Sequence, residues 1–423
     1  MKIAMRRNIT AIGLAVLLSG FACVANATSV LTEKGYTLEK LLVFSRHNIR
    51  ASLVGKDDVT ATHSNRQWNM AEVPAGHLTY KGGAAETLMG EYYRAYLEDE
   101  KFIPADWHPA KDDVRFYANS FQRTIATAKH FASGLAPIAD IEIEYHLGID
   151  ERDPVFLPSS KFTDEALLKQ ATQWYDLLEN GQGQKAFYKN RVQDLREIER
   201  IVDFKNSPFA KKEGIKQMDG SKFEITAHKN RIFSNDAMRK PYSLADCVIM
   251  RYYDNPNDKE VVWNISKPTR ALKAAGKFLS DGGSLMWKNP AFAKNMTRNL
   301  LPEIAKGLKS NQRITFLCGH DTNVGTLLTV LEVEDHELPQ TITNYVPIGS
   351  KLVIEKRKGA DGKLYASFDM VYASDKQLRN LEILTLHNPP VKEPLVIKGL
   401  KRNEDGLYDW DEFVNYFDKR AQN

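Results

Sequence analysis

The segment LLVFSRHNIR (residues 41–50) combines a buried strand with side chains suited to binding a phosphoryl group. Its first four residues are apolar, which is typical of a strand covered on both faces inside a parallel sheet. Arg46, His47 and Arg50 follow at once, and ligands of open α/β sheets bind beyond the carboxyl ends of strands. Arginine binds phosphate oxygens bidentately, and a neutral imidazole can act as a nucleophile. The segment therefore predicts an α/β fold with phosphate chemistry at this strand end.

A second segment, VRFYANSFQRTIATAK (residues 114–129), repeats the order of strand, polar residues and helix. VRFYA is typical of a strand, and Asn119 and Ser120 are residues that commonly start helices. Arg123 is then expected in the first helical turn, where free backbone N–H groups and the helix dipole favour an anion.

A third segment, RITFLCGHDTNVGTLL (residues 313–328), begins with the buried-strand run ITFLC. Gly319 permits a close backbone approach, His320 and Asp321 follow directly, and VGTLL begins the next helix. If the three strands are parallel neighbours, their polar ends meet in one crevice.

The convergence of these side chains predicts an anion site. Unpaired, three arginines and two histidines would repel one another and lose hydration, and a dianionic phosphoryl group relieves both effects. The anionic Asp321 is suited to act as a general acid that is protonated when phosphate binds. The predicted site consists of Arg46, His47, Arg50, Arg123, His320 and Asp321.

The first 27 residues predict a secretory signal peptide. A basic start is followed by an apolar run at 12–24 and a small-x-small cleavage site at 25–27. The run is too short for a comfortable membrane span, which disfavours a retained anchor. A lipoprotein attached through Cys23 is disfavoured because Gly20 stands where a large aliphatic residue is expected. We expect an exported protein in a bacterial periplasm, with no membrane attachment after cleavage.

The charge balance excludes a general affinity for polyanions. The full chain has 58 basic and 54 acidic residues, and removing residues 1–27 with their three basic side chains leaves 55 against 54. We therefore expect no nucleic-acid partner. No C-x-x-C or H-E-x-x-H spacing occurs, so neither a metal site nor a cofactor is expected. Cys247 and Cys318 could pair after export, but we favour buried thiols because Cys318 lies in an apolar strand.

The length predicts one large domain and a second, smaller one. We expect residues 28–149 and 289–423 to form an α/β catalytic domain, and residues 150–288 to form a mostly helical insertion. The segment 223–253 looks less regular and is locally basic. Its basic side chains could face the pocket or be solvated on the helical part; they are His228, Lys229, Arg231, Arg239 and Lys240.

The motifs RHNIR, NSFQRT and GHDTN, in this order with a helical insertion between the last two, resemble the histidine acid phosphatases. The resemblance covers essentially the whole mature chain and implies a phosphoglycerate-mutase-like three-layer sandwich with a helical second domain. RHNIRASL, LTYKGG, PIGSKL and VYASDKQLRN are most similar to the bacterial periplasmic glucose-1-phosphatases. Asn48 stands where many members, including many phytases, have Gly, and Ser52 departs from the usual proline. The disulfides common in exported relatives are missing.

The resemblance implies a two-step mechanism without metal. His47 attacks phosphorus, Asp321 protonates the leaving oxygen and then activates water, and the equatorial oxygens are held by Arg46, Arg50, Arg123 and His320. Because Asp321 must carry a proton in the first step, we expect an acidic working pH. Asn48 and Leu53 are implied to contribute to the substrate pocket.

The expected partner is a small-molecule phosphomonoester, and its identity stays open. Glucose-1-phosphate is one candidate and inositol hexakisphosphate, as in a phytase, is the alternative. A non-catalytic sugar-phosphate-binding protein would keep the arginines but lose His47 or Asp321, and both are present. A phosphotransferase or mutase of related fold is disfavoured by the predicted export.

Overall fold

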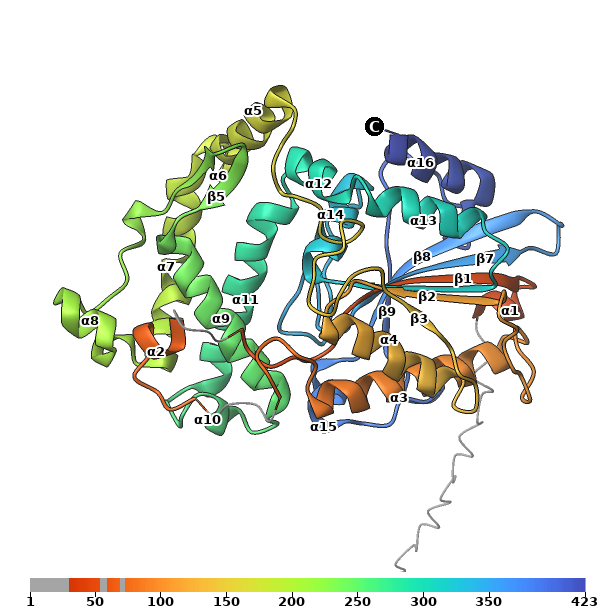
Figure 1. Cartoon of the computed structure of the whole chain (residues 1–423), viewed down its shortest axis with the longest axis horizontal. Helices are drawn as coiled ribbons and strands as arrows, with labels where there is room; N and C mark the ends of the chain where they lie inside the picture. Colours follow the sequence, from red (N-terminus) through yellow and green to blue (C-terminus); the bar gives the residue numbers. More distant parts are fainter. Residues whose placement is uncertain (1–29, 54–58, 69–72, 423) are drawn as a thin grey trace, which may run out of the picture.

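A mixed β-sheet with helices on both faces positions the predicted site (Figure 1). The computed structural model describes residues 30–53, 59–68 and 73–422, so the predicted signal peptide lies outside the described residues. Within these ranges the sheet has eight strands in the order β10-β8-β7-β1-β6-β2-β3, and β9 pairs with β8. They are β1 (Thr37–Arg46), β2 (Val114–Ala118), β3 (Ile143–Glu144), β6 (Ile314–Gly319), β7 (Lys351–Lys358), β8 (Leu364–Tyr372), β9 (Val391–Pro394) and β10 (Tyr408–Asp409).

The three strands that precede the predicted site residues are parallel neighbours. β6 lies between β1 and β2, with Phe44 opposite Leu317 and Phe116 opposite Phe316. β7 pairs antiparallel with β1, and β8 with β7, so the sheet is mixed and not entirely parallel. The expected convergence of the three carboxyl ends is therefore confirmed.

Both faces of β1 are covered by helices, as the run of apolar residues predicts. Leu41 and Val43 belong to the core formed with α3 and α4, whereas Leu42 and Phe44 belong to the core on the opposite face. The α/β fold class is therefore confirmed. The covering helices are α3 (Tyr80–Asp99) and α4 (Gln122–Leu135) on one face, and α13 (Leu300–Lys309), α14 (Asp321–Val330) and α16 (Trp410–Gln422) on the other.

A second group of helices lies beyond the carboxyl ends of the central strands (Figure 1). It has its own core, and α2 (Val59–His63) packs against it although it precedes residue 150. The proposed division at residues 150 and 288 stays a prediction. The group consists of α5 (Glu165–Gln173), α7 (Gly183–Val202), α8 (Pro208–Glu213), α9 (Asp236–Asp254), α10 (Asp258–Val261), α11 (Pro268–Trp287) and the hairpin of β4 (Ile225–His228) and β5 (Arg231–Ser234).

Several local predictions differ from the structure. The irregular segment expected at 223–253 contains a β-hairpin and the 19-residue helix α9, which tolerates Pro241 in its second turn. Residues 290–309 form two helices, α12 (Pro290–Thr297) and α13, with Pro302 in the first turn of α13. A proline in the first turn removes no intrahelical hydrogen bond, so Pro302 does not interrupt α13. The break between the two helices lies before Pro302, between Thr297 and Leu300.

The first residue of α4 and the bonding state of the two cysteines are known only from the structure. α4 begins at Gln122, not at Asn119 or Ser120, whose side chains bind other partners. Cys247 and Cys318 are both buried and are not joined by a disulfide. None of the helices in the described ranges has the length and apolar character needed to cross a bilayer.

A buried ion pair connects α3 to the start of β7. Glu86 Oε1 lies 2.7 Å from Lys351 Nζ, and both side chains are completely buried. Lys351 Nζ also donates to Ser45 Oγ and to the Gly349 carbonyl, each at 3.1 Å. Glu86 Oε2 accepts a hydrogen bond from Asn48 Nδ2 at 2.8 Å. Through its contacts with Ser45 and Asn48, the pair therefore stabilises the loop that carries His47.

We expect Lys351→Met to lower the free energy of unfolding by about 3–5 kcal/mol, because the Glu86 carboxylate would remain buried without its cation. Lys309→Met is the matched control, since Lys309 pairs with Asp418 at 2.7 Å and is 52% exposed. It should change the free energy of unfolding by less than about 1 kcal/mol. Urea denaturation measures both, and equal small losses would contradict a supporting role for the pair.

Candidate active site

The loops that follow β1, β6 and β2 are joined by backbone hydrogen bonds. The His47 N–H donates to the Gly319 carbonyl at 3.0 Å, and the Asn119 N–H donates to the Cys318 carbonyl at 2.9 Å. The ladder of the parallel sheet thus extends past the ends of its strands. Side chains from three distant parts of the sequence are held at fixed positions around one point.

His47 presents a nitrogen lone pair to this site. Its Nδ1 lies 2.8 Å from the Asn48 carbonyl oxygen, which can only accept, so Nδ1 carries the hydrogen and Nε2 is free to attack. Burial lowers the pKa of His47 well below its usual value, and Arg123, His320 and Arg46 lower it further. His47 therefore stays neutral, as a nucleophile must.

Arg46 and Arg50 are each held by a carboxylate. Arg46 Nη2 donates to Asp321 Oδ2 at 3.2 Å, and Arg46 Nη1 donates to the Val346 carbonyl. Arg50 Nη2 donates to both oxygens of Asp246 at 3.0 and 2.9 Å. Burial opposes the charge of Arg50, but Asp246 outweighs it and raises the Arg50 pKa. Both guanidinium groups are therefore ionised and fixed.

Arg123 lies in the first turn of α4, as the sequence indicates. Its Nη2 lies 3.3 Å from His320 Nδ1, and Nη1 donates to the Gly76 carbonyl at 3.4 Å. Burial, followed by the neighbouring charge of Arg50, lowers the Arg123 pKa to about 10. In the described part of the chain no carboxylate lies within ion-pair distance of Arg123. This half-buried cation is suited to bind an anion.

His320 and Asp321 complete the group at the start of α14. The rings of His47 and His320 lie with centroids 5.5 Å apart. Burial would raise the pKa of Asp321, but Arg46, His320 and Arg50 together hold it below its usual value. The side chain of Asp321 is 27% exposed, compared with 5% for Arg46. Asp321 is thus ionised without substrate and lies at the solvent side of the site.

The six residues of the predicted site are therefore brought together, whereas Asn48 and Leu53 lie in different places. Asn48 is 4% exposed, and its side chain binds Glu86 and the Ile49 N–H behind the loop. It does not face the space where a substrate would bind, and the expectation that it forms part of the pocket is not supported. Leu53 is 59% exposed and lines a cleft of about 1180 Å³ whose wall contains none of the six site residues.

The charged residues that line this cleft are balanced. Of the five basic residues singled out in segment 223–253, Arg239 and Lys240 line it, whereas the other three lie on the β4–β5 hairpin. Arg239 is paired with Asp236 at 2.5 Å. Three basic residues face three acidic ones: Lys222, Arg239 and Lys240, and Glu213, Asp219 and Asp236.

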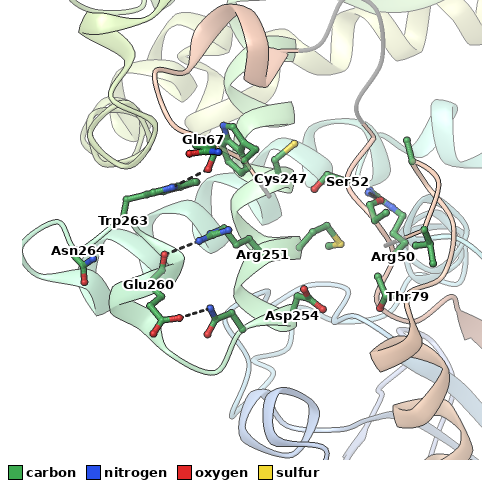
Figure 2. A pocket seen from close by; sticks show the side chains of 16 residues that line it. Arg50, Ser52, Gln67, Thr79, Cys247, Arg251, Asp254, Glu260, Trp263 and Asn264 are labelled. Atoms are coloured by element: carbon green, nitrogen blue, oxygen red, sulfur yellow. Dashed lines mark hydrogen bonds between the residues drawn. The ribbon is translucent and has the colours of Figure 1, made fainter. Parts of the chain in front are cut away.

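Another cavity, of about 520 Å³, is lined by the site residue Arg50 (Figure 2). Its wall combines Arg50 and Ser52 with Arg251 of α9 and with Trp263. The Arg251 guanidinium covers the Trp263 ring at 4.5 Å and donates to two backbone carbonyls. The Arg251 cation therefore already has partners within the protein.

Two residues that contact the site were missed in the sequence. Asp246 lies on α9 and binds Arg50. The sequence indicates it only as an acidic residue within the apolar run SLADCVIM, which is typical of a carboxylate with a buried partner. Asn119 was interpreted as a helix start, but it is buried beside His320. The described ranges contain no group of three or more His, Cys, Asp or Glu side chains that could hold a metal ion.

Comparisons with known proteins agree with this geometry. The family model described as histidine phosphatase superfamily (branch 2) matches residues 31–372. Glucose-1-phosphatase from Salmonella typhimurium is 30% identical and covers 97% of this chain and 99% of that protein. Phytase AppA from Escherichia coli is 25% identical over 89% of this chain and 90% of that protein. The apo structure of Hafnia alvei phytase covers 92% of this chain and 97% of its own, with 25% identity and a TM-score of 0.81. This chain belongs to branch 2 of the histidine phosphatase superfamily.

Proposed function

We propose that this histidine acid phosphatase hydrolyses a sugar phosphate of the glucose-1-phosphate type after export to the periplasm. That the chain is a phosphomonoester hydrolase follows from its family and its relatives. The observation that carries the mechanism is the free Nε2 of His47 among Arg46, Arg50 and Arg123. Export is supported by the signal-peptide pattern in residues 1–27.

In the first step His47 Nε2 attacks phosphorus, and the bond from phosphorus to the ester oxygen breaks. Asp321 donates its proton to that oxygen, so the sugar leaves as a neutral alcohol. Arg46, Arg50 and Arg123 stabilise the charge on the equatorial oxygens. These arginines supply the charge neutralisation that metal ions provide in kinases.

In the second step Asp321 takes a proton from water, and the resulting hydroxide attacks the phosphohistidine. The bond between phosphorus and Nε2 breaks, and inorganic phosphate leaves. Asp321 thus returns to its protonated form, and His47 recovers its lone pair. One carboxylate acts as acid and then as base, which requires that it lie near both the ester oxygen and the attacking water.

The acidic working pH depends on how substrate changes the pKa of Asp321. Without substrate, Arg46, His320 and Arg50 hold this pKa below its usual value. A bound phosphoryl dianion neutralises Arg46 and Arg50 and adds negative charge beside the carboxylate, so the pKa of Asp321 rises in the complex. The protonated fraction of the complex increases as pH falls, and we expect the rate of the first step to increase with it.

We expect Asp321→Asn to reduce kcat for glucose-1-phosphate by at least about 100-fold, because the sugar oxygen then leaves without a proton. With 4-nitrophenyl phosphate the leaving group needs no proton. The variant should therefore release one nitrophenol per active site in a burst and then turn over slowly, since water is not activated.

Stopped-flow absorbance measures this burst. Asp411→Asn on α16 is the control, because Asp411 is exposed and distant from the site. It should keep the wild-type rate and show no slow phase. An Asp321→Asn variant with equal losses for both substrates and no burst would contradict the assigned role.

The balanced charge of the cleft favours a substrate with one phosphate and a neutral remainder. Inositol hexakisphosphate would place further phosphates beside Glu213, Asp219 and Asp236. The phytase alternative is supported by Lys222 and Lys240 in the same cleft, and by the Hafnia alvei phytase fold, whose complex with myo-inositol hexakis sulphate covers 92% of this chain. The glucose-1-phosphatase relatives support the first candidate. A non-catalytic binding protein is disfavoured because the nucleophile His47 and the acid–base residue Asp321 are both present in the site.

We expect kcat/KM for glucose-1-phosphate to exceed that for inositol hexakisphosphate by about tenfold or more, since each uncompensated like-charge contact costs roughly 1 kcal/mol even in water. The double variant Glu213→Gln, Asp219→Asn should raise kcat/KM for the hexakisphosphate and leave that for glucose-1-phosphate unchanged. Phosphate release measures both. Faster hydrolysis of the hexakisphosphate by the wild type would favour the phytase alternative.

A further inference from the structure

Asn119 contacts the ring nitrogen of His320 that faces away from the other site residues. It follows β2 directly, is completely buried, and its Nδ2 lies 2.6 Å from His320 Nε2. The mechanism above uses His320 only as a group that holds phosphate, and it assigns nothing to Asn119.

Two backbone donors fix the orientation of the Asn119 amide. The Ser120 N–H donates to Oδ1 at 2.9 Å, and the Asp153 N–H donates to the same oxygen at 3.2 Å. A flipped amide would turn its NH₂ group against both N–H groups, which are also donors. Oδ1 therefore faces the backbone, and Nδ2 faces His320.

This orientation determines the tautomer of His320. Because Nδ2 is a donor, Nε2 must accept, and the hydrogen of the neutral imidazole is then on Nδ1. His320 Nδ1 and Arg123 Nη2 lie 3.3 Å apart, and in this tautomer both carry hydrogens. Arginine can only donate, so the 3.3 Å contact of Arg123 competes with the 2.6 Å contact of Asn119 for the single ring lone pair that accepts in a neutral imidazole. The shorter contact determines the tautomer, which leaves the hydrogens on Nδ1 and on Arg123 Nη2 for a shared acceptor.

We propose that Asn119 is a positioning residue that holds His320 as the neutral Nδ1–H tautomer, so that His320 and Arg123 donate to the same phosphoryl oxygen. The inference rests on the proposed phosphatase function for the identity of that oxygen. The two histidines then have opposite tasks. His47 presents a lone pair to phosphorus, and His320 presents a hydrogen to oxygen.

The surroundings of His320 keep it uncharged in acid. Protonation at Nε2 would turn the Asn119 contact into a donor–donor contact. Burial also lowers the His320 pKa well below its usual value, followed by the effect of Arg123. The charged and titratable groups that face the ring are Arg123 on α4, Asp321 on α14, and Arg46, Arg50 and His47 from β1 and its loop. Of these only Asp321 favours the imidazolium ion.

The test is Asn119→Asp, which keeps an acceptor for the Ser120 and Asp153 N–H groups but removes the donor to Nε2. Neutral His320 would then carry its hydrogen on Nε2, and the Nδ1 lone pair would oppose the phosphoryl oxygen. We expect KM for glucose-1-phosphate at pH 7 to rise about tenfold or more, the effect of one hydrogen bond to a charged group. As pH falls and His320 gains a second hydrogen, KM should return toward the wild-type value, while wild-type KM shows no such step.

The tautomer itself is measured by ¹⁵N NMR of histidine-labelled, substrate-free protein, with the His320 signals assigned by their loss in His320→Gln. We expect an unprotonated Nε2 and a protonated Nδ1 in the wild type, and the reverse in Asn119→Asp. This readout requires no turnover, so it separates failure of the inference from failure of the proposed function. A wild-type Nε2–H, or a variant with unchanged KM at every pH, would overturn the inference and leave Asn119 as a support for the loop alone.

Discussion

The repulsion among three guanidinium groups, two of them buried and one half-buried, is the constraint on which the rest of the structure depends. Two unit charges about 4 Å apart interact by roughly 4 kcal/mol at an effective dielectric constant of about 20. Arg46 and Arg50 are compensated by Asp321 and Asp246, whereas Arg123 has no such partner in the described ranges. The fold therefore holds a positive charge that a phosphoryl group neutralises, and the buried Glu86–Lys351 pair helps to keep the His47 loop in place.

The same electrostatics explain why one carboxylate can serve both steps of the reaction. Asp321 is the anion that the free site needs, because it pairs with Arg46. When substrate binds, its phosphoryl group pairs with Arg46 in place of Asp321. This favours protonation of Asp321 in the complex, where a proton donor is required. After the alcohol leaves, the carboxylate lies beside the phosphohistidine as a base. Phosphate binding and acid–base catalysis thus share two arginines, Arg46 and Arg50.

The central part of the fold could be predicted from the sequence because the signals are local. Four apolar residues before Arg46 specify a strand covered on both faces, and the ITFLC run does the same before His320. Six site residues follow from these strands, since parallel neighbours place their carboxyl ends together. The register between β1 and β6 then brings His47 and His320 to one point.

The parts that could not be predicted depend on contacts between distant segments. Asp246 comes from a helix of the second group and meets Arg50 only after folding, and nothing in its local sequence specifies that partner. Asn119 resembles a helix cap, but α4 starts three residues later and leaves its amide for His320. Asn48 was associated with the pocket through resemblance, although Glu86 holds its side chain behind the loop. The segment 223–253 was expected to be less regular, but packing against the core maintains α9 through Pro241.

Trapping the covalent intermediate tests the central claim most directly. Rapid quenching of a reaction with ³²P-labelled glucose-1-phosphate, followed by proteolysis and mass spectrometry, locates the phosphoryl group. The account predicts an acid-labile, base-stable label on His47 that is absent from His47→Ala and retained in His228→Ala, whose side chain lies on the exposed β4–β5 hairpin. A label on His320, or steady phosphate release by His47→Ala, would contradict it.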